Sequence, residues 1–152
     1  MNSLSANKFV YVTYIRTTPE RLWSALTTPE FTKQYWFGMH CESEWQAGSS
    51  WQLMFQDGRV ADAGEIVEAE RPKRLVIKWR NEFRPEIKAE GYSRCTIDLE
   101  PTGEAVKLTI THEIERPGTK FIEAVSGGWP RILSNLKSLL ETGEVALKDK
   151  VS

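Results

Sequence analysis

The sequence predicts an α+β fold in which a curved antiparallel sheet of about seven strands packs against one long C-terminal helix. Two observations support this fold. Across most of residues 48–114, apolar and polar side chains alternate, as they do in strands with one buried face. Residues 129–142 instead repeat apolar side chains at helical spacing, and a helix with such a face must cover a sheet to bury it.

The first strand is expected at residues 9–16, which are rich in β-branched and aromatic side chains. Two short helices should follow. Thr18-Pro19-Glu20 and Thr28-Pro29-Glu30 each offer an N-cap residue, a proline for the first turn and an early acidic side chain. Two helices separated by one turn cannot cross a sheet, so we expect them to form a V that closes one end of the core.

Six further strands complete the predicted sheet, at residues 40–44, 50–56, 60–69, 74–80, 92–100 and 105–114. Turn sequences such as Asp57-Gly58 separate them, and the connections are short, which favours an antiparallel meander. On the last strand Leu108 and Ile110 alternate with Lys107 and Thr109, so one face of the sheet should contact water.

The last helix is expected to begin at Trp129-Pro130, because proline suits the first helical turn, and to end at Gly143, which suits a left-handed stop. This places Phe121 just ahead of the helix. It also makes Gly127-Gly128 a flexible segment that could act as a lid.

Composition limits the classes of partner. The 152 residues, 40% of them hydrophobic, fit a single domain spanning residues 1–152 with an ordered core at about 8–143. A net charge of −1 and the absence of a long apolar run argue against nucleic acid and membrane as partners. The N-terminal residues lack a signal-peptide pattern, and Cys41 and Cys95 lie outside any Cys-x-x-Cys motif, so we expect a cytoplasmic protein with reduced, packing cysteines.

Candidate catalytic chemistry is sparse. His112 shares a strand face with Leu108 and Ile110 and therefore needs a buried partner or a ligand. Glu68 alternates in step with Gly64 and Ile66, so its side chain should face inward. An ion pair between this strand-end glutamate and a nearby arginine is favoured over a role as general acid. His40 has no second ligand at metal spacing. We therefore expect no catalytic residues, no metal and no cofactor.

Large aromatic rings are more numerous than a core of this size packs easily, which suggests that some of them line a cavity. Phe83, in a proline-bearing loop, and Phe121 are placed at its mouth. The candidate ligand-binding residues are Trp36, Trp51, Leu53, Phe55, Ile66, Trp79, Phe83, Ile97, Leu108, Ile110, His112, Phe121, Trp129, Ile132, Leu133 and Leu136.

Several blocks of the sequence together resemble a known family. They are Thr18 to Glu30, Tyr35-Trp36-Phe37, Ala47 to Trp51, Gly64 to Glu68 with Arg71 to Leu75, Thr109 to His112, and Gly128-Trp129 with Leu133, Leu136 and Leu139. In this order they are similar to the START-like helix-grip domains, in the branch related to the C-terminal domain of the activator of the heat-shock-protein-90 ATPase. The resemblance covers about residues 8–143. It implies a seven-stranded sheet around the C-terminal helix and a family that mostly binds hydrophobic molecules.

We therefore expect non-catalytic binding of a small hydrophobic or amphipathic molecule between the sheet and the last helix. One alternative is a module that binds a protein partner, such as a chaperone, through its surface. A second alternative is a cyclase-like enzyme, since some helix-grip relatives are cyclases. A cavity without convergent titratable groups favours the first function over the cyclase.

Overall fold

A computed structural model describes residues 3–4, 7–116 and 119–148 of the chain. Within them a single antiparallel sheet has the strand order β1-β2-β8-β7-β6-β5-β4-β3. The strands are β1 (Ser3–Leu4), β2 (Lys8–Ile15), β3 (His40–Ser43), β4 (Ser50–Met54), β5 (Val60–Glu70), β6 (Arg74–Asn81), β7 (Ser93–Thr102) and β8 (Ala105–Glu113). The seven predicted strands are all present, and the two-residue β1 adds an edge beside β2.

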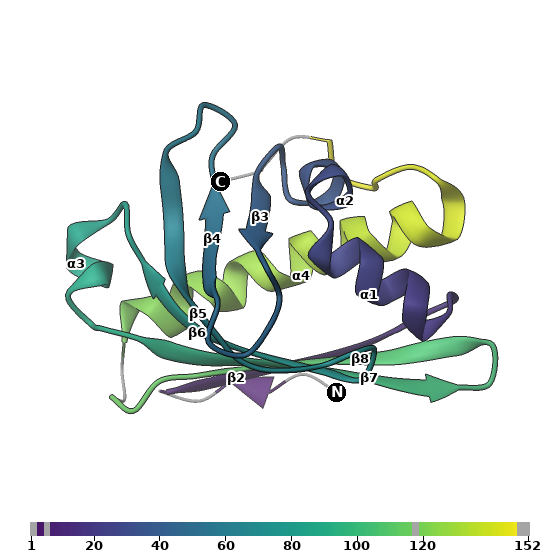
Figure 1. Ribbon diagram of the computed structural model, residues 1–152, viewed down its shortest axis with the longest axis horizontal. Helices are drawn as coiled ribbons and strands as arrows, with labels where there is room; N and C mark the ends of the chain where they lie inside the picture. Colours follow the sequence, from purple (N-terminus) through teal and green to yellow (C-terminus); the bar gives the residue numbers. More distant parts are fainter. Residues whose placement is uncertain (1–2, 5–6, 117–118, 149–152) are drawn as a thin grey trace.

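In the described part of the chain four helices accompany the sheet: α1 (Pro19–Thr27), α2 (Pro29–Tyr35), α3 (Pro85–Lys88) and α4 (Lys120–Thr142). Figure 1 shows the sheet curving around α4, with β2, β7 and β8 running beneath the helix and β3 and β4 rising beside it. The predicted α+β helix-grip architecture is therefore confirmed, with α1 and α2 together at one end.

The alternation on β8 is regular. Val106, Leu108, Ile110 and His112 are all buried, and the residues between them are partly exposed. The same pattern brings Cys95, Ile97 and Leu99 of β7 to the inner face. One face of the sheet thus packs on the core and the other contacts water, as the sequence predicts.

Helix α1 begins as predicted. Thr18 is the N-cap, its Oγ1 accepts a hydrogen bond from the backbone N–H of Arg21 at 3.2 Å, and Pro19 occupies the first turn. The hydroxyl of Tyr35, at the end of α2, donates to the carbonyl of Ala25 at 2.9 Å and ties the two helices together.

The predicted start of the last helix is wrong. α4 begins at Lys120, so Phe121 lies in its first turn, and Gly127, Gly128 and Pro130 lie in its interior. Thr119 is the N-cap, and its Oγ1 accepts the backbone N–H of Ile122 at 3.3 Å. The Glu90 carboxylate, from a distant part of the sequence, accepts the backbone N–H groups of Lys120 at 2.9 Å and Phe121 at 3.0 Å.

The predicted inward orientation of Glu68 is also wrong, because the pairing of β5 with β6 shifts register between Ile66 and Glu68. Such a bulge inserts one extra residue and reverses the face on which later side chains lie. The half-exposed carboxylate of Glu68 instead lies 3.4 Å from Nε of Arg74. The alternative of a strand-end glutamate tied to an arginine is therefore confirmed.

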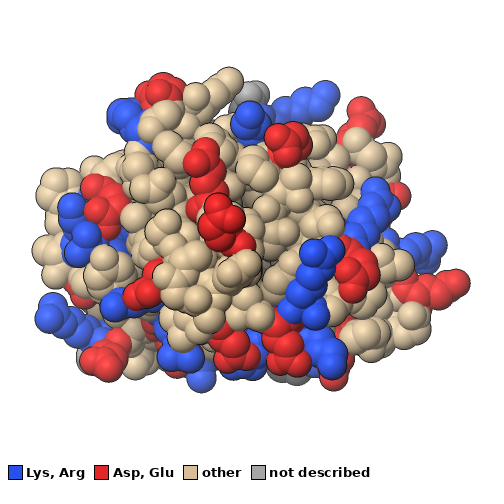
Figure 2. All heavy atoms as spheres, viewed as in Figure 1, with Lys and Arg blue, Asp and Glu red and all other residues tan. Residues whose placement is uncertain are grey.

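On the face drawn in Figure 2, lysine and arginine side chains are interspersed with aspartates and glutamates, so the described residues form no large patch of one sign there. None of the described helices has the length and hydropathy needed to cross a membrane.

Candidate functional site

A pocket of about 570 Å³ lies between the N-terminal half of α4 and strands β4 to β6. Its wall is mainly aromatic. Trp36, Trp79 and Trp129 come from the end of α2, from β6 and from α4, and the three rings contact one another with centroids 5.4 to 6.2 Å apart. These rings form the inner wall, and the exposed side chain of Phe83 marks the mouth.

Part of the pocket wall on α4 consists of small residues. Ala124 borders the pocket together with Gly127 and Gly128, which follow it by three and four residues and so lie on the same side of the helix. A Cβ atom added to Gly127 would meet no heavy atom within 4 Å, and one added to Gly128 would touch only Cδ1 of Ile132, at 4.0 Å. The missing side chains therefore leave space that larger residues would fill.

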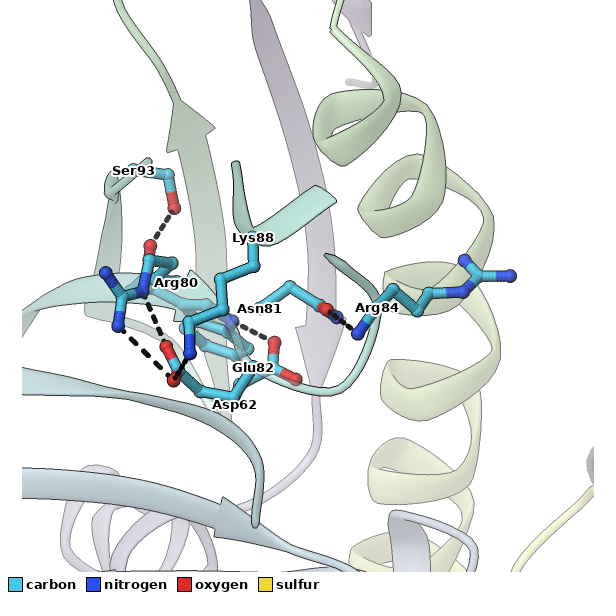
Figure 3. A network of polar contacts seen from close by, with 8 residues as sticks. Asp62, Arg80, Asn81, Glu82, Arg84, Lys88 and Ser93 are labelled. Carbon is cyan, nitrogen blue, oxygen red and sulfur yellow. Dashed lines mark hydrogen bonds and ion pairs between the residues drawn. The ribbon is translucent and has the colours of Figure 1, made fainter. Parts of the chain in front are cut away.

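Two polar residues border the inner part of the pocket. The buried carboxylate of Asp62 on β5 accepts a hydrogen bond from the indole N–H of Trp79. Asn81, at the end of β6, accepts the backbone N–H of Arg84 with its Oδ1 at 2.9 Å. Figure 3 shows this region from close by, with the side chain of Arg84 extending away from the other labelled residues.

The loop that carries Phe83 and Arg84 is fixed to the sheet by ion pairs. Oε2 of Glu82 lies 2.6 Å from Nε of Arg80 on β6, and Oε1 of Glu82 lies 3.1 Å from Nζ of Lys88 on α3 (Figure 3). Hydrogen bonding from Arg80, aided by Lys88, lowers the pKa of the Glu82 carboxyl. The loop therefore holds Phe83 and Arg84 beside the pocket.

His112 lies behind the pocket wall, in a chain of buried hydrogen bonds. Trp129 donates its Nε1–H to Nδ1 of His112 at 3.1 Å, and Nε2 of His112 lies 2.9 Å from Oγ of Ser93. Since that hydroxyl donates to the carbonyl of Trp79 at 2.8 Å, Nε2 carries the histidine proton and the ring is neutral. Burial lowers the pKa of His112 to about 3, which agrees with this state.

The structure divides the sixteen candidate residues into two groups. Eight border the pocket: Trp36, Leu53, Phe55, Trp79, Phe83, Phe121, Trp129 and Ile132. The other eight lie in the close-packed core and do not border it: Trp51, Ile66, Ile97, Leu108, Ile110, His112, Leu133 and Leu136. The division arises because the cavity occupies only the end of the sheet near β4 to β6, and α4 fills the rest.

Ten further residues border the pocket without having been predicted to bind: Phe37, Met39, Asp62, Asn81, Arg84, Ala124, Val125, Gly127, Gly128 and Arg131. Helical spacing continued upstream of Trp129, through Val125 to Phe121, is the sequence signal that could have found the members on α4. Asp62 and Asn81 have the same strand parity as inward-facing neighbours, so alternation is the signal that could have found them. Arg84 lies in a loop and carries no such signal.

Both cysteines, Cys41 and Cys95, are buried and free, and burial raises the pKa of each thiol far above its usual range. Neither borders the pocket. Among the described residues, no three His, Cys, Asp or Glu side chains are grouped so that they could hold a metal ion.

A family model described as activator of Hsp90 ATPase homolog 1-like protein matches residues 16–141. None of the curated proteins matches the chain significantly.

Among solved structures, protein MLL2253 from Mesorhizobium loti is 24% identical with a TM-score of 0.77, over 91% of this chain and 99% of that one. PFC0360w, an HSP90 activator from Plasmodium falciparum, is 22% identical with a TM-score of 0.72, over 88% and 96%. DynU16, a putative protein in the dynemicin biosynthetic locus, is 22% identical with a TM-score of 0.73, over 95% of this chain and 51% of that one. At these identities the structures support the fold alone.

Proposed function

The chain belongs to the family of activator of Hsp90 ATPase homolog 1-like proteins, and we propose that it binds a small hydrophobic or amphipathic molecule, without catalysis, in the pocket beside α4. The single observation that carries the proposal is an aromatic pocket of about 570 Å³. Sites for small molecules typically enclose about 300–1,000 Å³ and are lined mostly by apolar side chains with a few polar groups.

The composition of α4 supports this proposal. A glycine inside a helix costs about 0.8–1.0 kcal/mol relative to alanine, and a proline costs more. α4 carries Gly127, Gly128 and Pro130 within four residues, where the helix borders the pocket. Larger side chains at the two glycines would favour the helix but occupy the pocket. The stability lost here is therefore consistent with a requirement for open space.

The cyclase-like alternative is less well supported. Among the described residues that border the pocket, Asp62 is the only carboxylic acid, and the two arginines stay protonated at neutral pH. Acid–base catalysis on a bound molecule would require convergent titratable groups. The lining favours binding.

A chaperone-binding role is the second candidate, and one observation favours it. The family model carries the name of an Hsp90 ATPase activator, and the similar structure from Plasmodium falciparum is described as one. The test is the ATPase rate of the Hsp90 from the same host, measured with and without this protein. A saturable increase in that rate would support the chaperone role, and an unchanged rate would exclude activation.

The binding proposal is tested with N-phenyl-1-naphthylamine, an uncharged probe that fluoresces in apolar surroundings. The wild type should bind it saturably. Gly128→Leu should weaken binding at least about tenfold, a loss of about 1.4 kcal/mol, because the new side chain occupies the pocket. Ser134→Leu adds the same side chain on an exposed position of α4 and should leave binding unchanged.

Two results would contradict the binding proposal. The first is a wild type that does not bind the probe, and the second is a Gly128→Leu variant that binds it as tightly as Ser134→Leu does. If the probe results support the proposal, native mass spectrometry of protein purified from its own host would identify the natural ligand by the mass that accompanies the folded chain.

A further inference from the structure

Two arginines from different parts of the chain border the pocket. Arg84 belongs to the loop after β6, and Arg131 belongs to α4. Among the described residues, neither guanidinium makes a hydrogen bond or an ion pair, and that of Arg84 has only a distant contact with the Phe83 ring, 5.9 Å from its centroid. By contrast, Arg74 pairs with Asp98 at 3.0 Å and Arg80 pairs with Glu82 at 2.6 Å. Two unpaired cations therefore remain beside an apolar pocket.

The local structure positions both residues beside the pocket. Arg131 lies one helical turn after Gly127, and side chains on a helix lean toward its N-terminus. Since Gly127 and Gly128 have no side chains, the space over which Arg131 leans is open. The start of the Arg84 segment is fixed by the hydrogen bond from its backbone N–H to Asn81.

The negative and positive side chains of the pocket lie at different depths. Asp62 is only 8% exposed and uses its carboxylate to accept the indole N–H of Trp79. Arg84 is exposed and Arg131 is half-buried. The negative charge thus belongs to the inner part and the positive charges to the outer part. A bound anion would be attracted toward the mouth and repelled from the inner part.

Resting on the proposed function, we propose that the ligand is an anionic amphiphile. Its apolar body lies against Trp36, Trp79 and Trp129, and its carboxylate or a comparable single anionic group is bound by Arg84 and Arg131. Guanidinium groups are suited to this role because they present several N–H donors in a plane that matches the oxygens of such a group.

The test compares two probes with the same ring system, uncharged N-phenyl-1-naphthylamine and its sulfonated analogue 8-anilinonaphthalene-1-sulfonate. In the wild type the sulfonate should displace the uncharged probe, and its affinity should fall as salt is added. Arg84→Gln and Arg131→Gln should each lower the sulfonate affinity about tenfold, which is about 1.4 kcal/mol. Both variants should bind the uncharged probe as the wild type does.

The control is Arg16→Gln, which removes the same charge from an exposed position that does not border the pocket. It should leave both affinities unchanged. If the double variant at Arg84 and Arg131 binds both probes as the wild type does, the anionic ligand is excluded while the binding function stands. If the wild type binds neither probe, the proposed function fails, and this inference fails with it.

Discussion

The two halves of α4 lie against one sheet but pack differently. The C-terminal half presents Leu133, Leu136, Leu139 and Leu140, all buried, and it fills the space above β2 and β8 (Figure 1). The N-terminal half also carries the large side chains of Phe121 and Trp129, but Ala124, Gly127 and Gly128 lie between them and a pocket remains beside it. One helix in the helix-grip frame therefore adjoins both a packed core and a cavity, and the cavity lies where the helix carries small residues.

The largest expected effect is in the close-packed half. Leu136 is fully buried, so Leu136→Ala should lower the free energy of unfolding by about 2–5 kcal/mol while leaving probe affinity in the folded protein unchanged. Ile132→Ala, which enlarges an existing pocket, should cost less and should alter probe affinity. Urea unfolding and N-phenyl-1-naphthylamine titration measure the two quantities. Equal losses of unfolding free energy and equal probe affinities in the two variants would show that the two halves of α4 do not pack differently.

The next effect concerns the buried hydrogen bonds of His112. Its pKa is about 3 in the folded protein and about 6.5 when unfolded, so the unfolded chain binds more protons between these values. The stability that depends on neutral His112 is therefore fully present above pH 6.5 and is lost as the pH falls toward 3. Between pH 6.5 and 5 the loss should be about 2 kcal/mol.

Urea unfolding of the wild type and of His112→Gln at pH 7.5, 6.5, 5.8 and 5.0 measures this contribution. The variant should be less stable at every pH, because it disrupts the contacts with Trp129 and Ser93. Its free energy of unfolding should also fall less steeply with decreasing pH. Parallel pH curves for the two proteins would show that His112 does not titrate as described.

The smallest expected effect tests the glycines themselves. Gly127→Ala should raise the free energy of unfolding by about 0.5–1 kcal/mol, because the added Cβ meets no atom and alanine favours the helix. Gly64→Ala is the contrasting variant. A Cβ at Gly64 would lie 1.6 Å from the carbonyl oxygen of Lys78, so that variant should be strongly destabilised. Thermal unfolding of the two variants measures these changes. If Gly127→Ala proves less stable than the wild type, the fold itself requires glycine at this position.

Regular patterns made most of the fold predictable from the sequence. The strict alternation from Val106 to His112 defined β8, and Thr18-Pro19 defined the start of α1. Pro130 indicated the wrong start for α4, although the N-cap residue Thr119 is a local signal for the true one. The second capping group, the Glu90 carboxylate, comes from a separate part of the chain. The predicted orientation of Glu68 was wrong because a bulge depends on how two strands pair, which the sequence of one strand does not show.

The candidate site was predictable only in part. The apolar alternation identified inward-facing residues such as Trp79 and Leu108 alike, but it could not distinguish a residue beside a cavity from one under a packed helix. That distinction depends on which part of α4 lies above each strand. The contributions of Asp62 and Arg131 were missed because charged residues on a strand or helix are usually solvated.

Binding of a small molecule in the pocket beside the N-terminal half of α4 can be followed by the indole N–H signals of the six tryptophans in a ¹H–¹⁵N NMR spectrum. Three of these residues, Trp36, Trp79 and Trp129, border the pocket, and Trp23 and Trp45 do not. On titration with N-phenyl-1-naphthylamine, we expect saturable shifts of the signals of Trp36, Trp79 and Trp129 and none for Trp23 or Trp45. Shifts confined to Trp23 or Trp45, or no shifts at all, would contradict binding in this pocket.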